Sequence, residues 1–390
     1  MGESAFLISG ILAIPFAVFV LYYPNLQVRA GILLAVLLSG FLSFLGVPGI
    51  LGLLVLAFIA RDSNSILRTW SIGKLWWCLV TMGLLIALDP GGYSVSVSVG
   101  IAIAVYVSTA IRAGGLYVVS WGGFVGCLMF ALRNLAAPVI TVTDTIDGDA
   151  SLIGRRILPG LDPNATAAIL LLGIIFGIAI LMRIRGFPAL VVVVGMATMA
   201  TSIVLIAARY AMVAAALSLL FFWLSSGSLA RKAAIGAVAL AGGVLALPII
   251  VEVQSFARFA NLSGDADSRT DIYAHWWSLI YEDGFLLGLP KEVVAAQSTA
   301  PHNAVLEVLA HFGFIGLFAL VGTAWILILP FSVEGWQMRL PALSVLGLAM
   351  IVGLLAQYTP WLALVLLNAQ HCPVKNQDQT PDSDHGIAKT

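Results

Sequence analysis

Residues 299–320 read TAPHNAVLEVLAHFGFIGLFAL, and the character of the chain changes abruptly within them. Pro301, His302 and Asn303 follow a polar segment, whereas residues 304–330 are almost entirely apolar. An apolar helix needs roughly 20 residues to cross the hydrocarbon core of a bilayer, so this run is long enough. The stretch therefore predicts a membrane-spanning helix that begins where water meets lipid, with a His-Asn pair at that boundary.

The composition of the 390-residue chain extends this interpretation to the whole protein. Hydrophobic residues make up 61% of it and charged residues only 10%, against roughly 25% charged residues in soluble domains. We therefore expect an all-α, polytopic membrane protein. The formal net charge is zero, which gives no sign of a nucleic-acid partner. Cys78, Cys127 and Cys372 are scattered, so neither a disulfide framework nor a metal site is predicted, and no cofactor is expected.

Long apolar runs recur along the chain and predict about twelve spans, with an error of about one either way. They lie at about 5–23, 30–60, 75–89, 94–111, 116–132, 165–182, 187–207, 209–224, 233–250, 304–330, 340–357 and 358–370. The 30–60 run is ambiguous, because Gly46-Val47-Pro48-Gly49 could kink it or divide it in two. Thr359-Pro360 makes the last pair ambiguous in the same way.

We expect these spans to form one transmembrane domain over residues 1–370. The first run has no preceding Lys or Arg and no convincing cleavage site, so it is predicted to be a retained span. Residues 371–390 are polar and predict a disordered tail.

Basic residues occur in every second short loop, which places those loops in the cytoplasm. They are Arg61, Arg68, Lys74, Arg112, Arg183, Arg185, Arg231, Lys232 and Arg339. The remaining loops then face outward, and two of them are long, at 133–164 and 251–303. The outward face therefore carries most of the polar material from which a site could be built.

Three residues on the outward side are candidates for chemistry. Arg209 lies between two apolar runs. Burying an arginine at the membrane centre costs at least ~2.5 kcal/mol, so such a residue usually marks a site or a partner. Arg209 is therefore either an interfacial anchor or an anion clamp. Arg269 is expected just before a surface helix with tryptophans in the headgroup layer. His302 is a candidate general base, because imidazole titrates near neutral pH. Asn303 is expected to cap the following helix, with Glu307 near its positive end.

Further polar residues surround the start of the span near 165. Asp162-Pro163-Asn164 is a turn and helix-start signal. Arg155 and Arg156 precede it, and the planar guanidinium group of each suits a phosphate. We therefore count Arg155, Arg156, Asn164 and Asn303 as candidate substrate-binding residues.

Taken together, these segments resemble the O-antigen ligase and polysaccharide polymerase family of bacterial envelope proteins. PHNAVLEVLAHFGFIGLF is closely similar to its His-Asn-x-x-Leu motif with two following glycines. LPGLDPNATAAILLL, AARYAMVAAALSLL and SRTDIYAHWWSLIYEDGFLLGLP resemble three weaker motifs. Ala208 and Tyr210 replace the Ser and Gly that usually flank the arginine, and Gly284 replaces a Pro. The resemblance covers residues 155–330.

The resemblance implies a membrane-embedded, C-type, metal-independent inverting glycosyltransferase in the bacterial inner membrane, with its active site facing the periplasm. The donor would be a glycan on undecaprenyl diphosphate and the acceptor a glycan or a lipid, with chain-length or export partners left open. Arg209 and Arg269 would stabilise the departing diphosphate, and His302 would help remove the acceptor's proton.

Ligase and polymerase activities are not separated by these residues, and neither the sugar nor the acceptor is specified. A transporter or flippase of lipid-linked saccharides is the alternative class. A transporter would place charged residues deep within several spans, whereas here they gather at span ends and in outward loops.

Overall fold

The computed structural model describes most of the apolar chain. It covers residues 22–39, 48–137, 162–206, 208–225, 262–297, 303–328 and 358–368, with short pieces between 229 and 240, at 301, and between 342 and 347. Within those helices the side chains of residues 48–54, 209, 225, 262–269, 358 and 368 are outside the description.

Every regular element in these ranges is helical, which confirms the all-α prediction for the part of the chain that is described. The elements are α2 (Leu26–Leu38), α3 (Pro48–Arg61), α4 (Ser63–Thr69), α5 (Ile72–Leu88), α6 (Gly92–Ala110), the π-helical turn η2 (Ile111–Gly115), α7 (Leu116–Leu135), α8 (Pro163–Leu181), α9 (Phe187–Ile206), α10 (Arg209–Ser225), α13 (Leu262–Leu279), the π-helical turn η5 (Ile280–Gly284), α14 (Lys291–Ala295), α15 (Ala304–Ile328) and α17 (Tyr358–Asn368).

Four helical segments among the described residues are long and apolar enough to cross a membrane: Gly92–Leu135, Pro163–Leu181, Phe187–Ile206 and Ala304–Ile328. The pair α4 and α5, bent by 115°, makes a fifth if it counts as one span. Gly92–Leu135 has 44 residues and breaks at Gly114, where φ is 87°. At 1.5 Å per residue this segment is about twice as long as a bilayer core is thick.

The described helices settle one ambiguity in the predicted spans. The ambiguous 30–60 run contains two helices, α2 and α3, and Pro48 begins the second, as expected of proline in a first helical turn. The predicted runs at 5–23, 233–250 and 340–357 fall largely or wholly outside the described residues, so the count of twelve stays a prediction.

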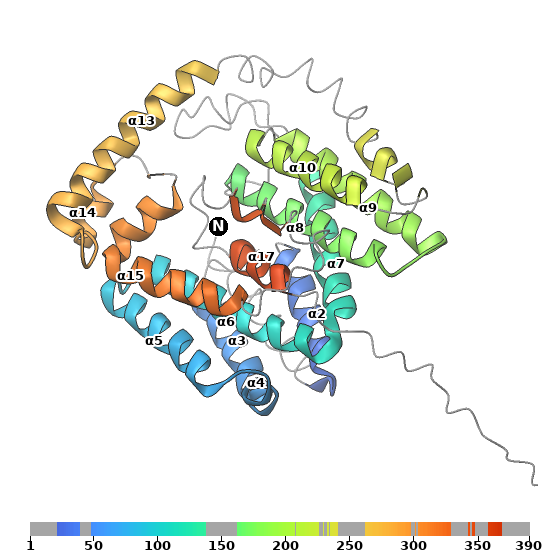
Figure 1. Cartoon of the computed structure of the whole chain (residues 1–390), viewed down its shortest axis with the longest axis horizontal. Coiled ribbons are helices and arrows are strands. Elements are labelled where there is room, and N and C mark those ends of the chain that lie inside the picture. The colour runs from blue at the N-terminus through green and yellow to red at the C-terminus, as the bar shows by residue number, and fades with distance from the viewer. Residues whose placement is uncertain are drawn as a thin grey trace, which may run out of the picture.

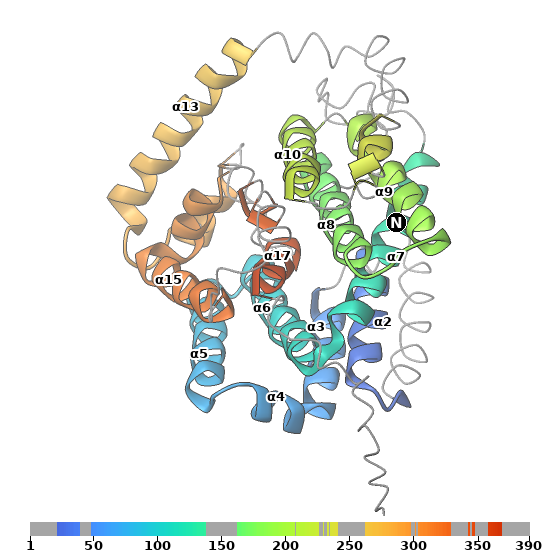
Figure 2. The ribbon, with the colours of Figure 1, turned by 45° about the vertical axis from the view of Figure 1, so that its right-hand side comes forward.

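The helices form two groups with α6 and α17 between them (Figures 1 and 2). One group contains α7, α8, α9 and α10, and the other contains α5, α13, α14 and α15. α8 is deeply enclosed, with every residue from Ala165 to Leu181 buried. A helix that is apolar on all sides is expected to be buried in this way.

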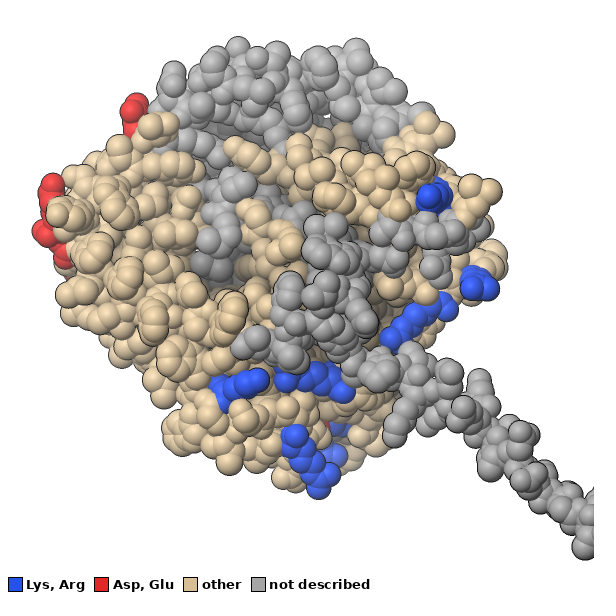
Figure 3. All heavy atoms as spheres, in the orientation of Figure 1, with Lys and Arg blue, Asp and Glu red and all other residues tan. Residues whose placement is uncertain are grey.

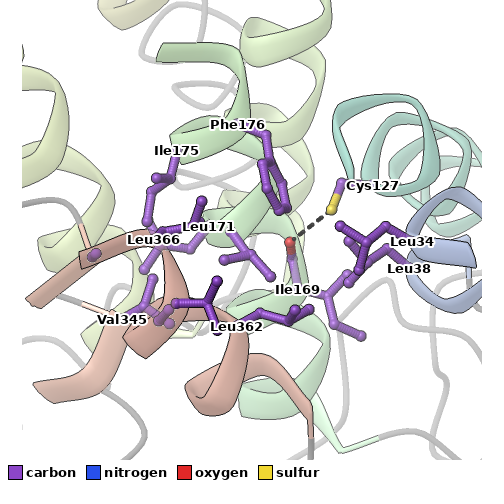
Figure 4. Close-up of a cluster of buried hydrophobic side chains, with 14 of the residues drawn as sticks. Leu34, Leu38, Cys127, Ile169, Leu171, Ile175, Phe176, Val345, Leu362 and Leu366 are labelled. Atoms are coloured by element: carbon purple, nitrogen blue, oxygen red, sulfur yellow. Dashed lines mark hydrogen bonds between the residues drawn. The ribbon is translucent and has the colours of Figure 1, made fainter. Parts of the chain in front are cut away.

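The core around α8 is shown in Figure 4. Leu362 and Leu366 of α17 lie beside Leu171 on one side of α8, and Leu34 of α2 and Cys127 of α7 lie on the other. The Cys127 thiol donates to the Ile169 carbonyl, with 3.2 Å between Sγ and O. The apolar core therefore joins segments from both ends of the sequence.

Glycines bring α2 and α7 into close contact. A Cβ atom on Gly122 would lie only 2.0 Å from the Gly31 carbonyl oxygen, and one on Gly126 only 2.6 Å from the Ala35 oxygen. Small residues allow this backbone approach, which is the usual way for helices to pack within lipid.

On the face shown in Figure 3, most visible basic and acidic side chains lie in different places. The visible Lys and Arg side chains gather towards the lower and right-hand edges, and the Asp and Glu side chains lie at the upper left. The exposed acids Asp271, Glu282, Asp283 and Glu292 belong to the α13–α14 region, whereas Arg61, Arg68 and Lys74 belong to the region from α3 to α5. The sidedness that the alternation of basic loops predicts stays a prediction.

A buried ion pair joins three helices in the opposite region from α13. Arg29 of α2 and Asp62, which precedes α4, form a salt bridge with both side chains at least 94% buried. A second Arg29–Asp62 bond measures 3.1 Å between Nε and Oδ2, and the Tyr106 hydroxyl of α6 donates to Oδ2 at 2.8 Å. Each of these three side chains gives the others a hydrogen-bond partner, which the surrounding apolar residues cannot provide.

Loss of either ionic partner is expected to destabilise the protein strongly. Arg29→Ala and Asp62→Ala should each lower the free energy of unfolding by about 3–5 kcal/mol, because each leaves a buried charge unpaired. The double variant should lose much less than the sum of the two. Unfolding by sodium dodecyl sulfate titration in bicelles measures this, with exposed Arg68→Ala as the control. Additive losses in the double variant would contradict the pairing.

Candidate functional site

Two adjoining hollows lie between the α5–α6 turn, α14 and the first half of α15. One, of about 220 Å³, is lined by the α5–α6 turn together with Lys291 of α14. The other, of about 260 Å³, is lined by Trp276, Gln297 and Pro301. Tyr93, Val294 and His311 line both, so we treat them as one site, the α6–α15 pocket.

Local sequence explains how the polar side chains reach this pocket. Asp89 follows the last residue of α5, and Pro90-Gly91 then turns the chain into α6, which places Tyr93 in its first turn. Asn303 caps α15, because its side-chain oxygen accepts from the backbone N–H groups of Val305 (2.9 Å) and Leu306 (3.2 Å). The predicted cap is therefore confirmed.

Glu307 and His311 are four residues apart on α15, so both side chains lie on one face of the helix. That face contacts the α5–α6 turn. The His311 Nδ1 atom lies 2.9 Å from Asp89 Oδ2, and the His311 ring stacks on Tyr93 with centroids 4.1 Å apart and planes at 7°. The Tyr93 hydroxyl donates to Glu307 Oε2 at 3.2 Å. Four side chains from α5, α6 and α15 therefore hold one another in place.

These contacts leave acceptor or donor atoms free to meet a ligand. An ionised Asp89 can only accept, so the proton of a neutral His311 ring lies on Nδ1 and its Nε2 becomes an acceptor. Among the described residues, His311 Nε2, Asp89 Oδ1 and Glu307 Oε1 have no hydrogen-bond partner. The pocket can thus bind groups that donate hydrogen bonds, and hydroxyls above all.

The start of α8 is capped as the sequence predicts. Asp162 caps this helix, with its Oδ1 accepting from Ala165 N at 2.8 Å, which confirms the helix start predicted at Asp162-Pro163-Asn164. Within the α6–α15 pocket, the described lining includes the carboxyl groups of Asp89 and Glu307 and one Lys or Arg side chain, that of Lys291.

A break in α15 supports the position of Glu307 and His311. Gly313 has φ 61° and ψ −165°, a conformation that essentially only glycine adopts. The loop after η5 packs against this break, so that Leu289 N donates to Ala310 O (2.7 Å) and Phe314 N donates to Phe285 O (2.8 Å). Backbone groups freed by the break are thereby paired, as a lipid environment requires.

The same loop leaves no room for a side chain at either facing glycine. A Cβ on Gly313 would lie 2.3 Å from the Leu286 carbonyl, and one on Gly288, where φ is 89°, would lie 2.6 Å from the His311 carbonyl. Two of the sequence segments that resemble family motifs therefore meet at these two glycines.

The predicted site residues are described only in part. Arg209 is the first residue of α10 and Arg269 lies within α13, but the side chains of both, and all of Arg155, Arg156 and His302, are outside the described residues. The expectation that Arg269 precedes its helix is wrong, because α13 already begins at Leu262. Asp265 and Asp267 in its early turns favour that earlier start. Asn164 is a partly buried residue of the first turn of α8.

Sequence reasoning missed Asp89, Tyr93 and His311. A signal was available for each: Asp89-Pro-Gly-Gly-Tyr93 is a polar turn between two apolar runs, and His311 is an ionisable residue inside an otherwise apolar span. Glu307 was assigned only to the helix dipole. The described residues contain no group of three or more His, Cys, Asp or Glu side chains placed to hold a metal ion.

Gly313→Ala is expected to disrupt the pocket's support. The new Cβ would collide with the Leu286 carbonyl. An alanine with the φ and ψ of residue 313 is also strained, which costs about 1–3 kcal/mol before the collision is counted. The melting temperature of the detergent-solubilised protein should fall by several degrees. Gly83→Ala in α5 is the matched control, because its Cβ would meet no atom within 4 Å. An equal melting temperature for both variants would contradict the tight approach at Gly313.

Comparison of the chain with protein-family models, curated proteins and solved structures found no match in any of the three.

Proposed function

We propose that this protein is a glycosyltransferase that acts within the bacterial inner membrane and faces the periplasm. Its donor is a glycan carried by undecaprenyl diphosphate, which it transfers to an acceptor or polymerises. The resemblance of residues 155–330 to the O-antigen ligase and polymerase family motivates this proposal. We further propose the C-type fold with about twelve spans that the resemblance implies.

One observation supports the proposal most directly: a polar pocket lies at the start of α15, where the most specific motif begins. Pro301 lines this pocket, and it immediately precedes His302. The pocket's polar groups come from the ends of α5, α6 and α15, all of which the basic-loop alternation assigns to the outward side. Glycan chemistry at the periplasmic surface requires polar groups at that boundary.

The proposed reaction uses the three residues singled out from the sequence. The acceptor hydroxyl oxygen attacks the anomeric carbon of the donor and forms the new glycosidic bond with inversion. The bond from that carbon to the diphosphate oxygen breaks, and its electron pair leaves with the diphosphate. Arg209 and Arg269 stabilise that charge, and His302 accepts the acceptor's proton. Arg155, Arg156 and Asn164 are proposed to bind the substrate.

The distribution of ionisable residues favours this proposal over a transporter. α8 and α9 contain no Asp, Glu, Lys, Arg or His at all. In α15 the ionisable residues are Glu307 and His311, both on the side of the Gly313 break that bears the pocket. A transporter that carries a charged lipid-linked substrate across the bilayer is expected to place such groups near the membrane midplane.

The test uses purified protein in liposomes supplied with an undecaprenyl-diphosphate oligosaccharide. We expect release of free undecaprenyl diphosphate, with a loss of at least about 100-fold in rate for His302→Ala, the range typical of a lost general base. His385→Ala, in the polar C-terminal segment, is the matched control and should keep the wild-type rate.

The products distinguish the alternatives. Release with a lengthening glycan indicates a polymerase, and release only with a separate acceptor indicates a ligase. Movement of the lipid-linked saccharide between leaflets without any release would contradict the proposal and indicate a transporter.

A further inference from the structure

We propose that the α6–α15 pocket is a binding subsite for a neutral saccharide unit of the substrate, held by Asp89, His311 and Glu307. This inference rests on the proposed glycan transfer, but none of these residues belongs to the three assigned to its chemistry. Sugar hydroxyls would then bind in the α6–α15 pocket, and the diphosphate would depart at a different place.

The size and lining of the pocket suit such a ligand. Its two hollows measure about 220 and 260 Å³, and together they fall within the ~300–1,000 Å³ typical of small-molecule sites. Leu289, Val294 and Ala310 form apolar walls, and a few polar groups converge between them. A sugar ring has the matching pattern, with apolar C–H faces and hydroxyls around its edge.

The polar groups are pre-organised, which reduces the entropy lost on binding. Asp89 fixes the His311 ring through Nδ1, Tyr93 stacks on that ring, and Glu307 accepts from the Tyr93 hydroxyl. The His311 side chain is 23% exposed and that of Asp89 11% exposed, so each reaches the pocket surface without being free to move into solvent. The atoms left over are acceptors, which suits the hydroxyl donors of a saccharide.

The hydrogen-bonding groups of the pocket distinguish between the two parts of a lipid-linked glycan. Carboxyl groups of Asp89 and Glu307 line it, and Lys291 is the one Lys or Arg side chain among the described lining residues. A diphosphate presents only acceptor oxygens, so it finds few donors among these carboxyl groups. Neutral hydroxyls would instead find carboxylate acceptors, so the saccharide belongs here and the diphosphate beside the arginines.

The first arm of the test measures binding to the full-length protein in nanodiscs by saturation-transfer NMR. The probes are the methyl glycosides of glucose, galactose, mannose and N-acetylglucosamine. We expect at least one to bind, and its affinity to fall about tenfold or more in Asp89→Asn and in His311→Phe, which keeps the ring stacking but removes both nitrogens. Asp283→Asn, an exposed carboxylate outside the pocket, is the control, and the melting temperature of each variant verifies that it is folded.

Binding of none of the four glycosides, or equal binding by the variants, would overturn the inference. A preference for spermidine over every glycoside would also overturn it, since the pocket would then select a cation.

The second arm measures transfer kinetics with the same variants, and it separates this inference from the proposed function. We expect Asp89→Asn and His311→Phe to raise the KM for the saccharide substrate about tenfold with a smaller effect on kcat. Wild-type transfer with unchanged KM in both variants would overturn the subsite and leave the transferase standing. Glycoside binding that depends on Asp89 and His311, without any transfer by the wild type, would support the subsite and overturn the transferase.

Discussion

Backbone groups that lie within lipid must find partners in the protein, and this constraint explains how the pocket is supported. α15 breaks at Gly313, and the loop after η5 supplies carbonyl and amide partners to the freed groups. Only glycine at positions 288 and 313 lets the two backbones approach closely enough. The break separates residues 304–312 from the apolar remainder of the helix, and the first part carries Glu307 and His311 to the α5–α6 turn.

The pocket therefore depends on three chain segments that are far apart in sequence. The turn at Asp89–Tyr93, the loop at 285–289 and the first half of α15 meet because α5, α13 and α14 all pack against α15. Elsewhere in the fold, α7, α9, α10 and α17 pack around the buried apolar surface of α8. The Arg29–Asp62 pair fastens α2 to α6 through Tyr106 in the region remote from α13.

Local patterns in the sequence predicted the parts of this structure that depend on local physics. Apolar length predicted the helices, and the caps at Asp162 and Asn303 followed from side chains that reach the first free N–H groups. The long-range contacts could not be predicted in this way. The Asp89–His311 bond joins residues 222 positions apart, and no single segment indicates that the two meet. The early start of α13 was missed because its first turns are polar and give no apolar periodicity.

We propose that saccharide and diphosphate occupy different parts of one site. The most direct measurement is a cryo-electron microscopy structure of the protein in nanodiscs with an undecaprenyl-diphosphate oligosaccharide bound. We expect saccharide density between Asp89, His311 and Glu307, with the diphosphate beside Arg209 and Arg269. Diphosphate density against Asp89 and Glu307, or a substrate enclosed at the membrane midplane with the pocket empty, would contradict it.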